Sequence, residues 1–217
     1  MLHTIIASIL IVLLGWGIAS RLTYDFQVWT DEGARRLEVA LQPIDAPPIL
    51  IEGPDLAETE LSALLRQKNK VTIVDFFYTR CQTVCLSLGS IFQQMQAALL
   101  NDESNDEHTG NIRLLSISFD REHDNLPALK TYADNLSARP ELWRFARVLQ
   151  AEQEQVLLQQ LGVVVIPDGH GDYEHNAALL VFDGAGRMVR IFDIEEYQLA
   201  LDYARHLARK QIQEASL

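Results

Sequence analysis

The sequence predicts an α/β domain with a mixed central sheet, preceded by one apolar segment long enough to cross a membrane. Three observations support this prediction. Leu2 to Ala19 is apolar almost throughout and contains no Lys, Arg, Asp or Glu. Short β-branched and aromatic runs then alternate with helical periodicities, which is the order of strand–helix–strand units. Two strand patterns near the end flank the turn sequence of residues 183–186 (DGAG), which adds an antiparallel pair.

The composition is that of a folded protein, and the pattern along the chain divides it into three parts. The 217-residue chain is 48% hydrophobic and 22% charged, a balance that disordered chains do not have. Its net charge of −12 argues against nucleic acid as a partner, because phosphate binding needs basic patches. We expect residues 1–20 to be a transmembrane anchor or signal segment, residues 21–47 a juxtamembrane linker, and residues 48–217 the folded domain.

The N-terminal apolar segment has two main interpretations. As a helix, Leu2 to Ala19 would span about 27 Å, close to the hydrocarbon thickness of a bilayer. This length and Trp16 near its end favour an uncleaved anchor. Gly17 and Ala19 also form a small-x-small pattern, so a signal peptide cleaved after Ala19 stays open. A helix buried in the domain is a third reading, which the absence of a polar face opposes.

The first half of the globular part begins after a proline-rich stretch at residues 42–48 (QPIDAPP). Residues 49–52 are apolar enough for a short strand. Leucines recur at helical spacing over residues 56–66, which predicts a helix. Residues 71–78 (VTIVDFFY) are mostly β-branched or aromatic and predict a strand buried on both faces. A helix with one apolar face follows over residues 86–100.

The second half continues the alternation. Residues 112–119 (IRLLSISF) predict a buried strand, and Pro127 suits the first turn of a helix over residues 127–136. The remaining elements are a short strand at 142–145, a helix at 151–161 ended by Gly162, strands at 177–182 and 187–192, and a helix at 195–214. This order is thioredoxin-like with an inserted helix. The fold class that we expect is a thioredoxin-like three-layer sandwich with a mixed central sheet, preceded by one N-terminal transmembrane helix.

The two cysteines of the chain lie in the turn between a strand and a helix. Cys81 and Cys85 follow the strand at residues 71–78 and open the helix at residues 86–100. Reactive groups collect at the carboxyl ends of strands in open α/β sheets, and a helix N-terminus favours a thiolate. Arg80 adds a neighbouring positive charge. Such a junction is a poor place for two cysteines that serve only as small apolar side chains.

The spacing of the cysteines favours a metal ion over a disulfide. If both were helical, their Cβ atoms would be ~5–6 Å apart. A disulfide needs about 3.8 Å, whereas a metal ion between the sulfurs tolerates the longer separation. A disulfide stays feasible if Cys81 precedes the helix. A redox pair, with Cys81 as nucleophile and Cys85 as resolver, therefore remains the alternative.

His175 is the histidine best placed to complete a metal site. It lies immediately before the strand at residues 177–182, and the loop that enters this strand faces the cysteine turn in the thioredoxin arrangement. Two thiolates and one imidazole form a soft, three-coordinate set that suits copper, particularly Cu(I), better than structural zinc. His170 is either an auxiliary ligand or a solvated loop residue. Asp120 lies at the same sheet edge and could orient a ligand or cap the next turn. The other histidines are expected at the surface or in the N-terminal segment: His3, His108, His123 and His206.

Three ordered segments resemble the Sco/SenC family of copper-binding cytochrome c oxidase assembly proteins: FFYTRCQTVC, SISFDREHDNLPALKTYA and EHNAALLVFDGAGRMVRIF. The resemblance covers about residues 48–209. It implies binding of Cu(I) and Cu(II) by Cys81, Cys85 and His175, and a part in building the binuclear copper centre of the oxidase. The sequence departs from the family where Gln82 and Leu86 follow the cysteines, since the family often has proline at these positions.

The resemblance also implies partners and a location. The copper acceptor would be cytochrome c oxidase subunit II or another copper-accepting exported protein. We expect a monomer, held in the inner (cytoplasmic) membrane by a single span, with the globular domain in the periplasm. The residues leave open whether the protein is an enzyme. The alternative function is a thiol–disulfide oxidoreductase acting on exported proteins, and a peroxidase-like activity has only the thiolate at the helix start in its favour.

Overall fold

The computed structural model describes residues 2–81, 84–103, 111–169 and 172–215, and of residues 84–86 and 103 it describes the backbone alone. The chain divides into two compact units, residues 1–42 and residues 43–217. Each unit is described by itself below.

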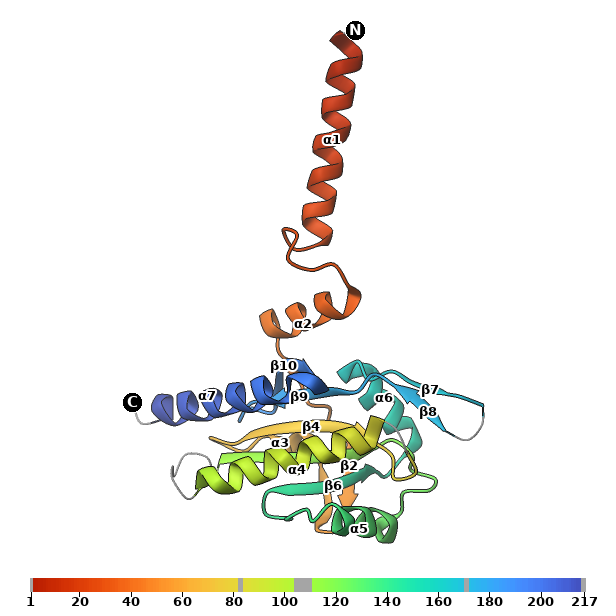
Figure 1. Cartoon of the computed structure of the whole chain (residues 1–217), viewed down its shortest axis with the longest axis vertical. Helices are drawn as coiled ribbons and strands as arrows, with labels where there is room; N and C mark the ends of the chain where they lie inside the picture. The colour runs from red at the N-terminus through yellow and green to blue at the C-terminus, as the bar shows by residue number, and fades with distance from the viewer. Residues whose placement is uncertain (1, 82–83, 104–110, 170–171, 216–217) are drawn as a thin grey trace. The chain divides into compact units, whose positions relative to one another are not determined.

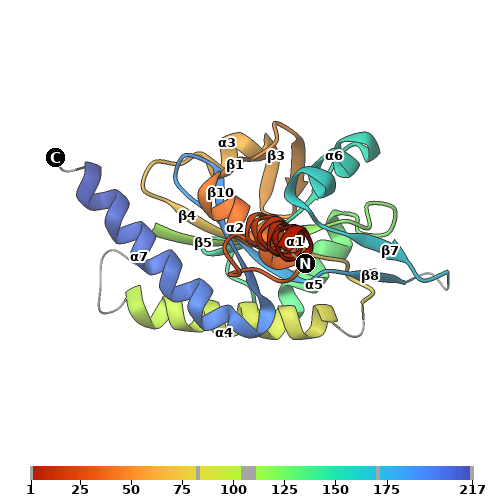
Figure 2. The ribbon, with the colours of Figure 1, turned by 90° about the horizontal axis from the view of Figure 1, so that it is seen from above.

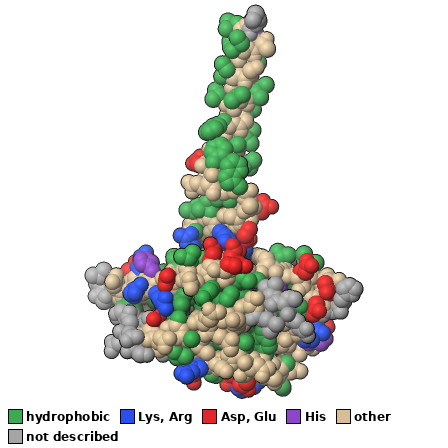
Figure 3. All heavy atoms as spheres, in the orientation of Figure 1, with side chains coloured by type: hydrophobic (Ala, Val, Ile, Leu, Met, Phe, Trp, Pro, Cys, Tyr) green, Lys and Arg blue, Asp and Glu red, His purple; other side chains and the backbone are tan. Residues whose placement is uncertain are grey.

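The first unit consists of two helices joined by residues 23–30. Helix α1 (Leu2–Leu22) has no buried residue, and apolar side chains cover it along its length (Figure 3). By length and composition it can cross a membrane, a test that a signal sequence also passes. Helix α2 (Asp31–Leu41) starts at Thr30, whose hydroxyl accepts the Gly33 N–H. The expected apolar helix at the N-terminus is confirmed.

The second unit is built on a mixed sheet. Among the described residues, eight strands form this sheet in the order β1-β10-β9-β4-β5-β6-β2-β3. Strands β4, β5 and β6 run parallel, and every other neighbouring pair is antiparallel. The strands are β1 (Ile44–Asp45), β2 (Leu50–Gly53), β3 (Leu56–Glu60), β4 (Val71–Phe77), β5 (Ile112–Ser118), β6 (Trp143–Val148), β9 (Ala178–Phe182) and β10 (Arg187–Asp193). The predicted mixed sheet is confirmed.

Strand β4 lies in the middle of the sheet because its sequence suits burial on both faces. All seven of its residues are buried. It pairs with β5 on one side and β9 on the other, so that Ile73 lies between Leu114 and Val181. A central strand with two covered faces is where a continuous apolar run is stable. This strand leads directly into the cysteine turn.

Helices cover both faces of the sheet and complete three layers (Figure 1). They are α3 (Leu61–Leu65), α4 (Val84–Glu103), α5 (Leu126–Asn135), α6 (Ala151–Leu161) and α7 (Tyr197–Ala215), the last preceded by the 3-10 turn η2 (Ile194–Glu196). Helices α4 and α7 pack together on one face, and α3 and α6 lie on the other (Figure 2). Helix α6 ends as predicted at Gly162, whose φ of 65° is left-handed.

One predicted helix is wrong. Residues 56–60 form strand β3, which pairs with β2, and only Leu61–Leu65 is helical. The leucine spacing suits a helix, but the turn at Pro54 and Asp55 brings the chain back so that residues 56–60 pair with β2. Gly53 is required there, since a Cβ atom at this position would lie 1.9 Å from the Phe145 carbonyl oxygen.

Two further pairings were not expected from the sequence. Ile44 and Asp45, in the proline-rich stretch, form β1 and pair with Met188 and Arg187 of β10. Strands β7 (Val165–Pro167) and β8 (Tyr173–His175) form a separate two-stranded sheet. The second pairing matters for the site, because His175 is the last residue of β8.

Candidate metal centre

The cysteine turn follows the carboxyl end of β4, as predicted. Cys81 is buried, and its backbone N–H donates to the Tyr78 carbonyl at 3.3 Å. Helix α4 begins at Val84, so Cys81 precedes the helix while Cys85 lies in its first turn. The side chain of Cys85 lies outside the described part of the chain. Because Cys81 is not helical, the separation expected for two helical residues does not apply, and this position is the one in which a disulfide stays feasible.

The β7–β8 hairpin carries His175 to an aromatic cluster. This cluster consists of Tyr78, Phe119, Tyr173 and His175. The His175 ring packs edge-on against Phe119, with 5.1 Å between ring centroids. Tyr173, two residues earlier on the same face of β8, contacts both Phe119 and Tyr78, at 5.7 and 5.3 Å. The hairpin therefore presents one face of β8 to the ends of β4 and β5.

Tyr78 connects the cysteine turn to this hairpin. Its hydroxyl oxygen accepts the Tyr173 backbone N–H at 3.2 Å and lies 3.4 Å from the Asp172 carboxylate. The same hydroxyl is hydrogen-bonded to the side chain of Cys81. Burial raises the pKa of Tyr78 to about 12 against the opposing hydrogen bond from the Tyr173 backbone, and the charge and hydrogen bond of Cys81 and the charge of Asp172 add to the rise. The phenol thus stays protonated at neutral pH. Its hydroxyl lies between Cys81 and strand β8, which ends in His175.

His175 is half-buried, and its environment favours the neutral ring. Burial lowers the pKa of its imidazole, and its Nδ1 atom is inaccessible to solvent. A neutral imidazole is the form that ligates metals, so at pH 7 a proton does not compete for the ring. Tyr78 contacts Cys81 and Phe119, and Phe119 contacts His175, so Cys81 and His175 lie at the same end of the sheet, as predicted. Binding of one metal ion by both stays a prediction.

Asp120 fixes Arg80, the residue before Cys81. It is buried, and its Oδ2 accepts from Arg80 at 2.9 and 3.3 Å while its Oδ1 lies 2.7 Å from Nδ1 of His123. Its backbone carbonyl accepts the N–H groups of His123 and Asp124 and so starts the next turn. His123 is exposed at the surface, as expected, and pairs with Asp120 in addition. Asp120 therefore acts on the cysteine turn through Arg80, and its role toward a bound ligand stays a prediction.

Asp124 holds the other residue that precedes Cys81, and reasoning from residue types alone missed it. It is fully buried, and its carboxylate accepts three hydrogen bonds: from the backbone N–H of Thr79 at 2.9 Å, the Thr79 hydroxyl at 2.5 Å and the Ser118 hydroxyl at 2.5 Å. Burial raises its pKa, and the hydrogen bonds from Ser118 and Thr79 oppose this shift. The available sequence signal was its place as the second aspartate of the SISFDREHD segment.

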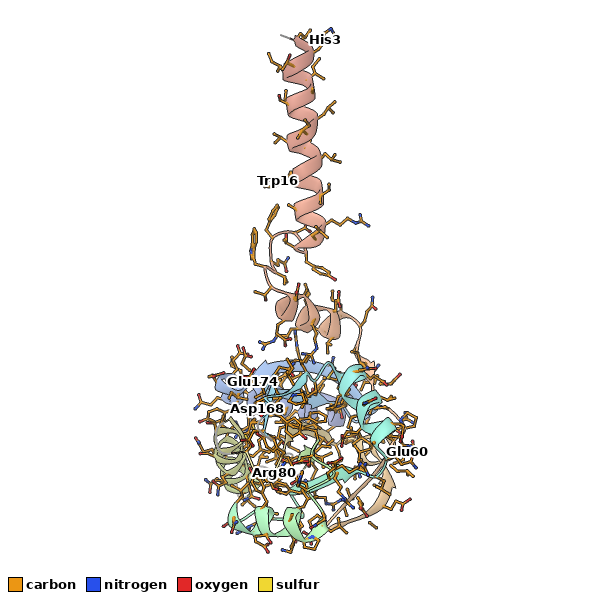
Figure 4. The ribbon with its side chains drawn as sticks, turned by 90° about the vertical axis from the view of Figure 1, so that its right-hand side faces the viewer. His3, Trp16, Glu60, Arg80, Asp168 and Glu174 are labelled. Carbon is orange, nitrogen blue, oxygen red and sulfur yellow. The ribbon has the colours of Figure 1, made fainter. Side chains whose placement is uncertain are left out.

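The structure describes the side chains of two of the three predicted copper ligands, Cys81 and His175. Among the side chains that the structure describes, no three His, Cys, Asp or Glu residues converge on one point. The predicted ligand Cys85 and the candidate auxiliary ligand His170 lie outside that set. In Figure 4, Arg80 lies on the same side of the domain as Asp168 and Glu174 of the β7–β8 segment. The donors that are described, a buried thiol and a neutral imidazole, are the soft and borderline types that suit copper.

Comparisons with known proteins support the resemblance found in the sequence. A protein from Bacillus subtilis (strain 168), the SCO1 protein homolog, is 23% identical over 151 residues, which are 69% of this chain and 74% of that protein. The structure of BsSco, a member of the Sco family of cytochrome c oxidase assembly proteins with a disulfide switch, has a TM-score of 0.64 at 19% identity. It covers 77% of this chain and 95% of its own.

A copper-bound structure also has the same fold. ScoI of Bradyrhizobium japonicum, solved with copper bound, has a TM-score of 0.56 at 21% identity and covers 74% of this chain and 99% of its own. The profile of the SCO1/SenC family matches residues 65–209, which include the cysteine turn, the Asp120 segment and His175. This chain therefore belongs to the SCO1/SenC family.

Proposed function

We propose that this protein is a membrane-tethered copper metallochaperone that binds one copper ion through Cys81, Cys85 and His175. It delivers this ion to the binuclear copper site of cytochrome c oxidase subunit II or of another copper-accepting exported protein, or keeps the thiols of that site reduced. The observation that carries the proposal is the Tyr78 hydroxyl, which contacts both Cys81 and the backbone of the strand that ends in His175. Copper in ScoI and the oxidase-assembly role of the Sco family support it.

The residues around the proposed ligands have separate tasks. Arg80 precedes Cys81 and Cys85 lies in the first turn of α4, so a guanidinium group and the positive end of a helix dipole lie near the cysteine turn, which favours thiolates over thiols. The lowered pKa keeps His175 neutral and able to donate its lone pair. Copper is the cargo, so the site has to hold it firmly and still release it. Three ligands leave room for an incoming acceptor thiolate to bind copper before the chaperone's own ligands dissociate.

Copper titration of the reduced full-length protein in lipid nanodiscs tests the proposal. We expect one Cu(I) per chain, measured by competition with a chromophoric chelator, and loss of this stoichiometric binding in Cys81→Ser, Cys85→Ser and His175→Ala. His206→Ala is the matched control, because His206 is exposed on α7. A wild-type protein that binds no stoichiometric copper, or a Cys81→Ser variant that binds it normally, refutes the metallochaperone function.

A thiol–disulfide oxidoreductase acting on exported proteins is the second candidate. The position of Cys81 ahead of α4 favours it, since a residue outside the helix can approach Cys85 more closely than a helical one. The disulfide switch of BsSco points in the same direction. Here Cys81 would be the nucleophile and Cys85 the resolver, and His175 would be dispensable. Reductase activity that persists in His175→Ala while copper binding is lost would make this the main function.

The proposed function includes a location. With residues 1–20 as an uncleaved anchor and residues 21–47 as a linker, residues 48–217 would stand in the periplasm as a monomer. Protease added to intact spheroplasts should then remove the folded domain, and the retained N-terminal fragment should fractionate with the inner membrane. A soluble, shortened protein in the periplasm would instead show cleavage after Ala19.

A further inference from the structure

A cavity lies at the edge of the sheet opposite the cysteine turn. Its volume is about 310 Å³, and it is formed where the parallel strands β4, β5 and β6 begin. Thr72, Arg113 and Arg144, each the second residue of its strand, line it. Cys81 follows the far end of β4, so the cavity is separate from the candidate metal centre. Neither the SCO1/SenC resemblance nor the proposed function uses it.

Strand register places the two arginines on one face of the sheet. Thr72 pairs with Arg113, and Leu115 pairs with Arg144. Arg113 and Leu115 are two residues apart on β5 and therefore point to the same side. Leu64 and Leu65 of α3 also line the cavity. The pocket is therefore lined both by aliphatic side chains and by two arginines.

The charge of this pocket is opposite to that of the protein. Two guanidinium groups and the carboxylate of Glu141 give a net charge of about +1, whereas the whole chain carries −12. Each arginine is held in place by its own strand region. Nη1 of Arg113 donates to the Ile112 carbonyl at 2.8 Å, and Nε of Arg144 donates to the Pro140 carbonyl at 2.9 Å. Arg144 uses only its Nε–H in the bond to Pro140, so its two Nη groups can point toward a ligand.

We propose that this cavity binds a small carboxylate with an aliphatic tail. A guanidinium group matches a carboxylate with two parallel hydrogen bonds, and the Thr72 hydroxyl can donate a further one. The leucines bury the tail. The cavity volume of about 310 Å³ equals the volume that about ten water molecules occupy in the liquid. It lies at the small end of the range for known ligand pockets. A singly charged ligand balances the pocket, whereas a phosphate dianion exceeds its positive charge.

Calorimetric titration of the full-length protein in lipid nanodiscs tests this proposal, with empty nanodiscs as the blank. The probe is 4-methylpentanoate, and 4-methylpentanamide is its uncharged counterpart of the same shape. We expect the carboxylate to bind at least 10-fold more tightly than the amide. Arg144→Gln should weaken it about 10- to 100-fold, the loss expected for a charge-assisted hydrogen bond. Arg209→Gln, an exposed arginine of α7, should bind like the wild type.

A second variant separates loss of binding from loss of folding. Leu64→Phe places extra side-chain volume at the cavity wall and leaves both arginines, so it should abolish binding while the thermal unfolding transition persists. The proposal is overturned if the carboxylate and the amide bind equally, if Arg144→Gln binds like the wild type, or if inorganic phosphate binds more tightly than the carboxylate. Failure of copper binding leaves this result unaffected, because the two sites lie at opposite edges of the sheet.

Discussion

Replacing the buried Asp75 by asparagine should stabilise the protein above neutral pH. Asp75 lies in the middle of β4, is fully buried, and is paired in register with Ser116 of β5. The Ser116 side chain hydrogen-bonds to it, and Ser116 in turn accepts Nε1–H of Trp143 at 2.9 Å. Its Oδ1 atom has no hydrogen-bond partner among the described residues. An ionised carboxylate in this position is poorly compensated.

The magnitude follows from the pKa of this group. Burial raises the pKa of Asp75 from 3.8 to about 7, against weaker opposing hydrogen bonds from Ser116 and its own backbone. Between these two values the unfolded chain has lost the proton and the folded chain has kept it. The free energy of unfolding therefore falls as pH rises, by about 1.4 kcal/mol per pH unit and by about 4 kcal/mol in total. Above pH 7 both states are ionised and the loss is complete.

Asparagine has the shape of the protonated acid and does not ionise. The Asp75→Asn protein should lack this pH dependence and should exceed the wild type by up to about 4 kcal/mol at pH 8, while the two are similar at pH 4. The assay is urea unfolding of both full-length proteins in detergent at pH 4, 6 and 8, followed by tryptophan fluorescence. The comparison cancels other titrating groups, such as Glu154, whose pKa burial also raises to about 7. A stability difference that is the same at all three pH values would refute the reasoning.

Three further substitutions test the contacts that position the site. Tyr78→Phe removes the hydroxyl between Cys81 and the β8 backbone. The Cu(I) affinity measured by chelator competition should fall about 3- to 10-fold. An unchanged affinity would show that this hydroxyl does not position the copper ligands. Asp124→Ala removes the acceptor of three hydrogen bonds, so the free energy of unfolding measured in urea should fall by ~3–5 kcal/mol. The control is Asp134→Ala, at an exposed aspartate, which should lower it by less than about 1 kcal/mol. Gly53→Ala forces β2 away from the Phe145 carbonyl and should cost at least about 1–3 kcal/mol, which a normal urea midpoint would contradict.

Much of the fold follows from local sequence signals. Strand β4 has the β-branched and aromatic composition of a strand buried on both faces, and α6 ends at a left-handed glycine, so local sequence is enough to predict both elements. The segment at residues 56–66 does not, because its leucines have helical spacing although residues 56–60 form a strand. Pairing with β2 decides the outcome, with Ile51 opposite Thr59, and such pairing is a contact that periodicity does not report.

The same distinction applies to the site. The position of Cys81 follows from the strand–turn–helix pattern, which is local. The contact between Tyr78 and Tyr173 joins residues 95 positions apart in the sequence. It depends on the β7–β8 hairpin, which local sequence patterns did not predict. The sequence could therefore nominate His175 as a ligand through its family resemblance and its place before β9, but not the hydroxyl that ties its strand to the cysteine turn.

The turn that holds Cys81 is also held by the loop that follows the neighbouring strand β5. Strands β4 and β5 end together, with Phe77 opposite Ser118. From the loop after β5, Asp124 binds Thr79 and Asp120 binds Arg80, so both residues before Cys81 are fixed by acids on one short segment. Since a carboxylate can hold an N–H group or a guanidinium group at a defined place only if its own backbone is fixed, the β4–β5 register sets the location of the thiol. Sequence changes in residues 118–124 should thus alter the proposed copper site without touching a ligand.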